Sequence, residues 1–147
     1  MKGGSKVDKF RRFLVPLDGS DCAENVLPMA EKLAAELKAS FVLLRVALAN
    51  TFPGVDPTEA QLKVVREAEA YLQKVEDRLK AKGFKVDSHV RYGNDAEEIL
   101  EHADGKDIDL IAMTTHGRSG VKRFLLGSVA EKILRYSPKP IFLVRCT

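Results

Sequence analysis

The chain has 147 residues, of which 45% are hydrophobic and 31% charged, and its formal net charge is +3. This is the composition of an ordinary globular protein, and so small a basic excess argues against a nucleic-acid partner. No apolar run approaches the ~20 residues that span a bilayer, and the polar residues 1–9 do not resemble a signal peptide, so we expect no membrane partner. Cys22 and Cys146 do not show the repeated cysteine spacing of disulfide-rich secreted domains, which predicts a protein of the reducing cytoplasm.

The length predicts one domain, which we place at residues 10–147 after a flexible arm at residues 1–9. Its first strand is predicted at residues 13–17. The turn Asp18-Gly19-Ser20 follows, and Ser20 is suited to cap a helix. Apolar residues then recur at helical spacing, which predicts an amphipathic helix with a buried stripe made of Val26, Ala30, Leu33, Ala34 and Leu37.

The middle of the chain predicts two more strands and two more helices. Residues 41–46 are almost continuously hydrophobic, as in a strand covered on both faces. After a loop at residues 49–57, Thr58 and Gln61 form a capping-box pattern that opens a long helix. That helix has one apolar stripe, which we assign to the core although a partner-binding face has the same pattern: Val65, Ala68, Leu72, Val75 and Leu79. Val86–Tyr92 alternates in polarity, which predicts a strand at a sheet edge, and a short helix follows at residues 96–103.

The most informative stretch is a glycine-rich loop between a predicted strand and a predicted helix. The strand is predicted at residues 109–113 and the helix at residues 129–134. Gly117 and Gly120 allow the backbone to turn and a ligand to approach closely. Arg118 adds positive charge to the loop, so the stretch is suited to an anionic ligand.

The end of this loop has two interpretations. Gly127 and Ser128 place free N–H groups and the positive end of a helix dipole at the exit from the loop, which indicates an anion site, usually for phosphate. However, Ser128 and Glu131 also form a capping box, a pattern that many helices carry for stability alone.

Strict alternation of strands and helices, ending in a strand at Ile141–Val144, favours an α/β fold. We predict a Rossmann-like three-layer sandwich with a five-stranded parallel sheet in the order 3-2-1-4-5. In that order the Asp18 turn and the loop at residues 114–128 face each other at the carboxyl ends of the first and fourth strands, where such folds bind ligands. A carboxylate opposite a phosphate-binding loop predicts a nucleotide site.

The sequence resembles the universal stress protein family over essentially the whole domain. The resemblance rests on residues 15–20 (VPLDGS), on the loop at residues 113–128 and on the closing residues 139–144 (KPIFLV). The family's nucleotide-binding pattern is Gly-x2-Gly-x9-Gly-Ser/Thr. Its second and third parts match Gly117, Gly127 and Ser128, whereas Thr114 stands where the first glycine is expected.

The resemblance implies an ATP-binding member that acts as a nucleotide-dependent regulatory module in stress response. Asp18 and the backbone of Val46 are then expected to hold the adenosine. Gly117, Gly127, Ser128 and Val129 are expected at the phosphates, with a divalent cation, Mg²⁺ or Mn²⁺, bound through them. The candidate nucleotide-binding set is completed by the flanking residues Pro16, Leu17, Met113, Thr114, Thr115, His116, Arg118 and Gly120.

The resemblance also implies a homodimer through Ile141–Val144, and two other functions fit the same residues. One is a dimeric interaction module with a vestigial nucleotide site. Both this module and the nucleotide-dependent regulatory module would act on a protein partner that the sequence does not identify. The other is a slow ATPase, because a phosphate cradle with a metal lowers the barrier without a dedicated base. His89, His102 and His116 share no metal-ligand spacing, and no nucleophile–base pair has credible spacing, so we predict no catalytic residue and no protein-built metal site.

Thr114 is the departure from the pattern, and it allows two conformations of the site. A β-branched residue with positive φ would be an outlier, so Thr114 is predicted to be extended, with the chain turning later at Gly117. In the first conformation, which we favour, the Thr114 side chain points away from the crevice, its hydroxyl bonds to loop backbone and the pocket stays open. Alternatively, the side chain points inward and fills part of the ribose site.

Overall fold

The computed structural model describes residues 10–105, 107–116 and 126–146. Strands and helices alternate along these residues: β1 (Arg12–Pro16), α1 (Asp21–Glu24), α2 (Val26–Leu37), β2 (Ser40–Ala47), α3 (Pro57–Ala81), β3 (Val86–Tyr92), α4 (Asp95–Ala103), β4 (Leu110–Thr114), α5 (Ser128–Tyr136) and β5 (Ile141–Val144). The strands form one sheet in the order β3-β2-β1-β4-β5 and pair in parallel. The predicted fold and strand order are therefore confirmed, and β3 lies at an edge as expected. The predicted arm at residues 1–9 lies outside the described residues.

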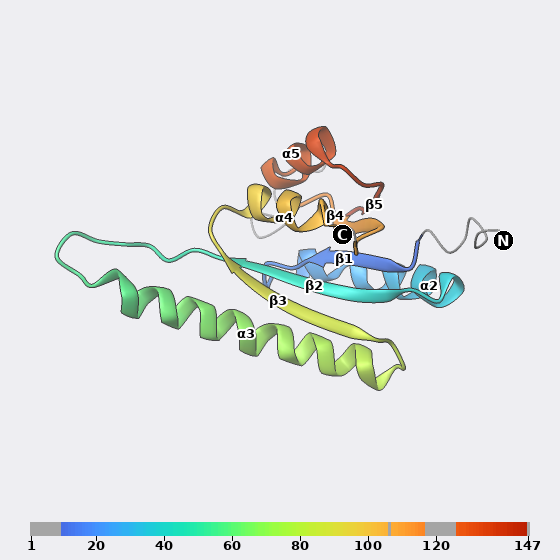
Figure 1. Cartoon of the computed structure of the whole chain (residues 1–147), viewed down its shortest axis with the longest axis horizontal. Helices are drawn as coiled ribbons and strands as arrows, with labels where there is room; N and C mark the ends of the chain where they lie inside the picture. The colour runs from blue at the N-terminus through green and yellow to red at the C-terminus, as the bar shows by residue number, and fades with distance from the viewer. Residues whose placement is uncertain (1–9, 106, 117–125, 147) are drawn as a thin grey trace.

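Side chains of the sheet alternate between two faces, and different helices cover each (Figure 1). On the face that we call the α2/α3 face, Phe13, Phe41 and Leu43 pack with residues of α2 and α3. On the opposite α4/α5 face, Leu14 and Leu44 pack with residues of α4 and α5. The central strands are buried on both sides, which explains their continuous hydrophobicity in the sequence.

The long helix α3 follows the predicted apolar stripe. Ala68, Leu72, Val75 and Leu79 are buried, and Val65 near the start of the stripe is partly exposed. The stripe therefore packs in the core of the α2/α3 face, as assigned from the sequence. Among the described helices, none combines the length and apolar character that a membrane crossing needs.

The caps at the helix starts agree only in part with the sequence. Ser20 caps α1 as predicted, with its side chain accepting a hydrogen bond from the Ala23 amide. The predicted capping box at Thr58 is wrong, because Asp56 is the N-cap of α3 and accepts from the Thr58 amide. The predicted capping box at Ser128 is also wrong, because Gly127 is the N-cap of α5 and Ser128 is already helical. This second difference bears directly on the site.

Candidate functional site

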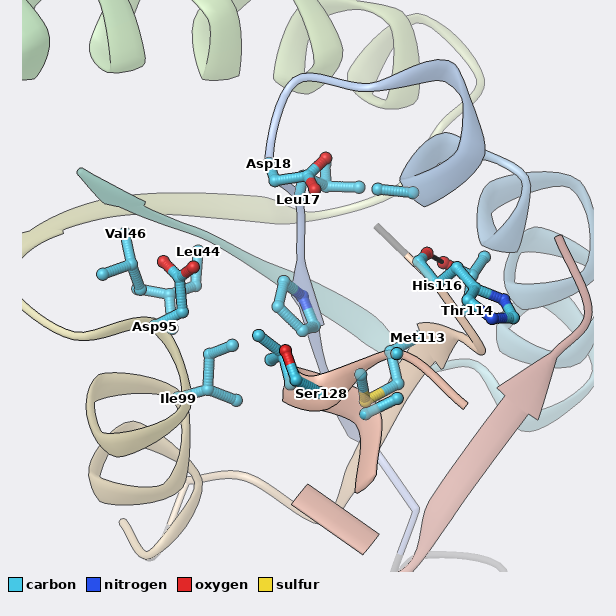
Figure 2. Close-up of a pocket in the computed structure, with 15 residues that line it drawn as sticks. Leu17, Asp18, Leu44, Val46, Asp95, Ile99, Met113, Thr114, His116 and Ser128 are labelled. Carbon is cyan, nitrogen blue, oxygen red and sulfur yellow. Dashed lines mark hydrogen bonds between the residues drawn. The ribbon is translucent and has the colours of Figure 1, made fainter. Parts of the chain in front are cut away.

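A cavity of about 250 Å³ opens at the carboxyl edge of the sheet (Figure 2). It lies between β1 and β4, where the strand order reverses: β2 and β3 follow on one side of β1, and β4 and β5 on the other. This is the position at which open α/β sheets bind their ligands. Ten of the predicted residues line it: Pro16, Leu17, Asp18, Val46, Met113, Thr114, His116, Gly127, Ser128 and Val129.

Asp18 stands on one wall of this cavity, in the turn that follows β1. Its Oδ1 atom accepts hydrogen bonds from the backbone N–H of Ser20 at 2.9 Å and from the Ser20 hydroxyl at 2.6 Å. Gly19 between them has φ +89°, and an added Cβ there would lie 2.5 Å from Nη1 of Arg45. Glycine is therefore favoured at this turn by its positive φ, whereas the flexible end of Arg45 could move aside, and the turn fixes the carboxylate at the pocket.

The same wall is supported from behind by α3. The Arg45 guanidinium lies over the Tyr71 ring, 5.2 Å from its centroid. The Tyr71 hydroxyl donates to Oε2 of Glu24 at 2.5 Å, and Arg78 pairs with Oε1 of the same carboxylate at 2.8 Å. Burial, together with the hydrogen bond to Glu24, holds the pKa of Tyr71 far above its usual value of 10.0, so the phenol stays protonated and remains a donor.

The N-terminus of α5 forms the opposite wall. The Gly127 amide donates to the Thr115 carbonyl at 2.8 Å, and no side chain of the described residues caps the helix. The φ of Gly127 is −64°, which any residue adopts, but an added Cβ would lie 3.3 Å from the Thr115 oxygen and 3.4 Å from Cα of His116. Glycine therefore allows the two backbone segments to pack closely here. The positive end of the α5 dipole thus faces the cavity at Ser128.

Thr114, Thr115 and His116 connect β4 to this wall. Thr114 is the last residue of β4, is only 4% exposed, and donates from its hydroxyl to the His116 carbonyl at 2.6 Å. The predicted extended conformation and backbone-satisfied hydroxyl are therefore confirmed. Thr114 is nevertheless one of the residues that line the cavity, so its predicted orientation away from the crevice is not confirmed. The Thr115 hydroxyl lies 3.0 Å from Nδ1 of His116 and accepts from the Cys146 amide at 3.3 Å, so this side chain serves the C-terminal segment and is not among the lining residues.

The remaining walls were not predicted from the sequence. Asp95, at the start of α4, adds a second carboxylate to the lining, and the apolar surface is completed by Ala23, Leu44, Ile99 and Ala130. Leu44 could have been inferred, because it lies two residues before Val46 on the same side of β2. Nothing in the sequence indicated that the α4 N-terminus would reach this crevice. The predicted residues Gly117, Arg118 and Gly120 lie outside the described residues.

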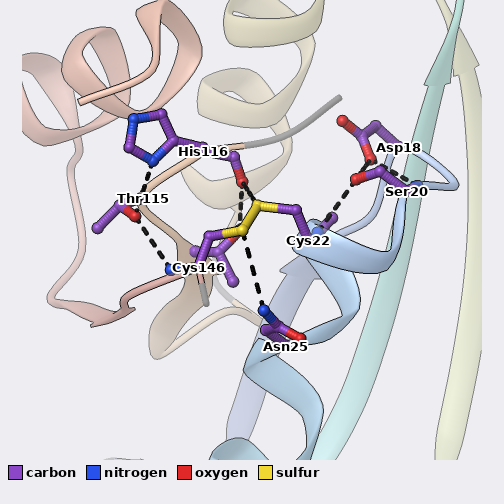
Figure 3. The surroundings of a disulfide bond; sticks show 9 residues. Asp18, Ser20, Cys22, Asn25, Thr115, His116 and Cys146 are labelled. Carbon is purple, nitrogen blue, oxygen red and sulfur yellow. Dashed lines mark hydrogen bonds between the residues drawn. A yellow bond between two sulfur atoms is a disulfide. The ribbon is translucent and has the colours of Figure 1, made fainter. Parts of the chain in front are cut away.

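The two cysteines are paired, which the sequence analysis did not predict. Cys22 and Cys146 form a disulfide bond beside the cavity, with 5.3 Å between their Cα atoms (Figure 3). The two residues are 124 positions apart, so their spacing gave no sign of the pairing. In the part of the chain that the structure describes, no three His, Cys, Asp or Glu side chains gather as a metal site.

Comparisons with known proteins agree on one family. The profile of the universal stress protein family matches residues 9–145. The universal stress protein YxiE of Bacillus subtilis is 32% identical, with 92% of this chain and 99% of that protein covered. Protein MJ0577 of Methanocaldococcus jannaschii has a similar solved structure, with a TM-score of 0.79 and 27% identity over 95% of this chain and 98% of that one. A universal stress protein solved in complex with cAMP has a TM-score of 0.62 and 25% identity, and the match covers 94% of this chain and 98% of that one.

Proposed function

The chain belongs to the universal stress protein family, and from that premise we propose that it binds ATP in the cavity between β1 and β4. The observation that carries this proposal is the α5 N-terminus, which faces the cavity and has no side-chain cap among the residues that the structure describes. Its first N–H groups and its dipole favour a phosphate. The helices α1, α3 and α4 bond a first-turn amide to Ser20, Asp56 and Asn94, whereas α2 also starts without a side-chain cap but contributes no residue to the cavity lining.

The adenosine is proposed to lie on the other side of the cavity. Leu44, Val46 and Ile99 form an apolar surface suited to the base, and the Asp18 carboxylate can accept hydrogen bonds from ribose or base. The cAMP complex of a similar universal stress protein supports an adenine nucleotide as the ligand class. In the proposed pose, the nucleotide therefore runs from β2 toward the start of α5.

We propose that the divalent cation, Mg²⁺ or Mn²⁺, enters with the nucleotide and is held through the phosphates. Any hydrolysis is proposed to be slow, because it would rest on phosphate positioning and the cation alone. The proposed role is that of a nucleotide-dependent regulatory module in the cytoplasm, where ATP occupancy changes the surface offered to a protein partner.

A homodimer through β5 is part of the same proposal. Among the described residues, β5 pairs only with β4 and forms one edge of the sheet, and its four side chains are partly exposed. An apolar edge of this kind favours pairing with a second copy across a two-fold axis. Sedimentation at micromolar concentration should give twice the 16.3 kDa mass of the chain, and Leu143→Lys should shift it to monomer.

The binding proposal is tested by titration calorimetry with ATP and Mg²⁺. Gly127→Glu should abolish binding, because it introduces a side chain and a negative charge at the phosphate position. Gly105→Glu is the matched control, since a Cβ there also meets a backbone oxygen, that of His102, at 3.3 Å, but away from the cavity lining. The proposal fails if Gly127→Glu binds ATP as tightly as Gly105→Glu does.

A further inference from the structure

The disulfide ties together the carboxyl ends of three neighbouring strands. Cys22 lies in α1, just after the turn that follows β1, and Cys146 lies two residues beyond β5. Between them lies the segment that follows β4, where the His116 carbonyl oxygen is 3.3 Å from Sγ of Cys22. The Cys146 amide donates to Oγ1 of Thr115 at 3.3 Å. Figure 3 shows the bond with these groups around it.

These same segments form the nucleotide cavity. Ala23, next to Cys22, lines it, as does His116. The His116 carbonyl also accepts the Thr114 hydroxyl, and the Thr115 carbonyl accepts the Gly127 amide at the start of α5. A change at the disulfide therefore reaches the α5 wall through two hydrogen bonds at Thr115 and the Asp18 wall along the chain through α1.

Both cysteines are partly exposed, so a small thiol can reach the bond. In a reducing compartment, a disulfide is usually transient and serves catalysis or redox sensing. We propose that Cys22 and Cys146 are a reversible redox pair, reduced by a dithiol or by glutathione, and that the oxidised pair holds the cavity in its tight-binding form. The second half of this proposal rests on the proposed ATP binding.

The reaction is a thiol–disulfide exchange. A thiolate of the reductant attacks one sulfur of the Cys22–Cys146 bond and forms a mixed disulfide, and the other cysteine leaves as a thiolate that takes up a proton. The second thiol of the reductant then attacks the mixed disulfide and releases the first cysteine, which is protonated in turn. The protein gains two electrons and two protons, and the reductant becomes a disulfide. Oxidised glutathione reverses both steps.

Reduction releases α1 and the segment after β5 from each other. The Asp18 turn is continuous with α1, and Thr115 loses a partner when the Cys146 amide moves away. Both walls must then be ordered again when ATP binds, which lowers affinity. We expect the reduced protein to bind ATP roughly three- to tenfold more weakly than the oxidised protein.

The first experiment counts thiols on the full chain. Air-oxidised protein should show no maleimide-reactive thiol and run as a monomer on a denaturing non-reducing gel, and dithiothreitol should expose both cysteines. Excess reduced glutathione should open the bond and oxidised glutathione should close it. Free thiols after oxidation would contradict the proposed disulfide. A disulfide that resists excess glutathione would contradict the proposed reversibility and would make the bond purely structural.

The second experiment titrates ATP and Mg²⁺ into oxidised and reduced wild type and into Cys22→Ser and Cys146→Ser. Both variants should bind like the reduced wild type and should not respond to dithiothreitol. If the oxidised and reduced wild type bind ATP with equal affinity, the proposal that the cysteine pair controls the cavity is wrong. If neither redox state binds ATP, the proposed function fails together with this control, while the thiol count still decides the pair itself.

Discussion

The two faces of the sheet are covered by helices of very different length. On the α2/α3 face, the 25-residue helix α3 runs along β2 and β3, and the core is filled by large side chains such as Phe13 and Phe41. On the α4/α5 face, each helix has nine residues, and both begin at the carboxyl edge of the sheet. Leu44, Ile99, Met113 and Ala130 belong to this second cluster and also line the cavity. The α2/α3 cluster contributes only Leu17 and Ala23 to the cavity lining, so the α4/α5 face leaves more of its core open at the binding site.

The edge strand β3 shows the same difference within one element. Its side chains toward the α2/α3 face include Val86 and Val90, which join or contact the apolar core. The alternate residues are Asp87, His89 and Arg91. Asp87 pairs with Arg12 at 2.7 Å, and His89 lies against His102 of α4, with ring centroids 5.1 Å apart. The short helices leave this side polar, which explains why β3 alternates in the sequence.

Neighbouring leucines of β2 offer the most direct way to test the comparison. Leu43 and Leu44 are both 0% exposed but lie on opposite faces. Leu43→Ala leaves a closed cavity in the α2/α3 core and should lower the free energy of unfolding by about 3–5 kcal/mol. Leu44→Ala only enlarges a cavity that is already open, so its cost should be smaller, about 2–3 kcal/mol. Urea denaturation of the two variants measures both values.

The pair also separates stability from binding. Leu44→Ala should weaken ATP binding in calorimetry because Leu44 lines the cavity, while Leu43→Ala should leave the affinity unchanged as long as the protein is folded. Equal losses of stability, or a larger effect of Leu43→Ala on ATP affinity, would show that the two faces do not differ in this way.

Thr114 tests the opening of the cavity with a smaller expected effect. Its hydroxyl is bonded to the His116 carbonyl, and the strand conformation does not require glycine. Thr114→Gly should therefore change ATP affinity by less than about tenfold, or ~1.4 kcal/mol. Titration calorimetry on the two proteins decides the matter. If the wild type does not bind and Thr114→Gly gains clear binding, the site is vestigial and the interaction-module function replaces the proposed one.

Sequence patterns predicted the features that depend on residues close to one another along the chain, such as strands, turns and one helix cap. The parallel α/β sheet followed from the alternation of strands and helices, and the Ser20 cap and the turn at Asp18 followed from local side-chain chemistry. The order 3-2-1-4-5 required the further assumption that the first and fourth strands are neighbours, which the structure confirms. The cap of α5 could not be decided locally, because Ser128 is compatible with either cap or helix and the choice depends on the contact of Gly127 with Thr115. The Cys22–Cys146 bond depends on tertiary proximity that the sequence does not show.

The place of Asp95 in the cavity is the least predictable feature of the site. The sequence marks Asn94 and Asp95 as a helix start, and Asn94 indeed caps α4. Whether that start faces the crevice depends on how α4 packs across the sheet, which is set by contacts with α5 and β2. Periodicity defines the buried side of a helix but not its direction over the sheet.

The smallest predicted effect is a pH dependence that belongs to the α4/α5 face. Burial, with smaller contributions from the charges of His89, Arg91 and Arg12 that outweigh Glu101, lowers the pKa of His102 below its usual 6.5. The unfolded chain therefore binds this proton more readily, so stability should fall as the pH drops through the unfolded value. Hydrogen bonds from Lys80 and Ser88 lower the carboxyl pKa of Glu76 on the α2/α3 face, and a hydrogen bond from Arg12 lowers that of Asp87. These two carboxylates therefore lose their contributions to the free energy of unfolding only in stronger acid. Urea denaturation at about pH 7.5 and about pH 5.5 should show a modest loss of stability that His102→Gln reduces and that Glu76→Gln leaves unchanged. An identical loss in His102→Gln would place the titrating group elsewhere.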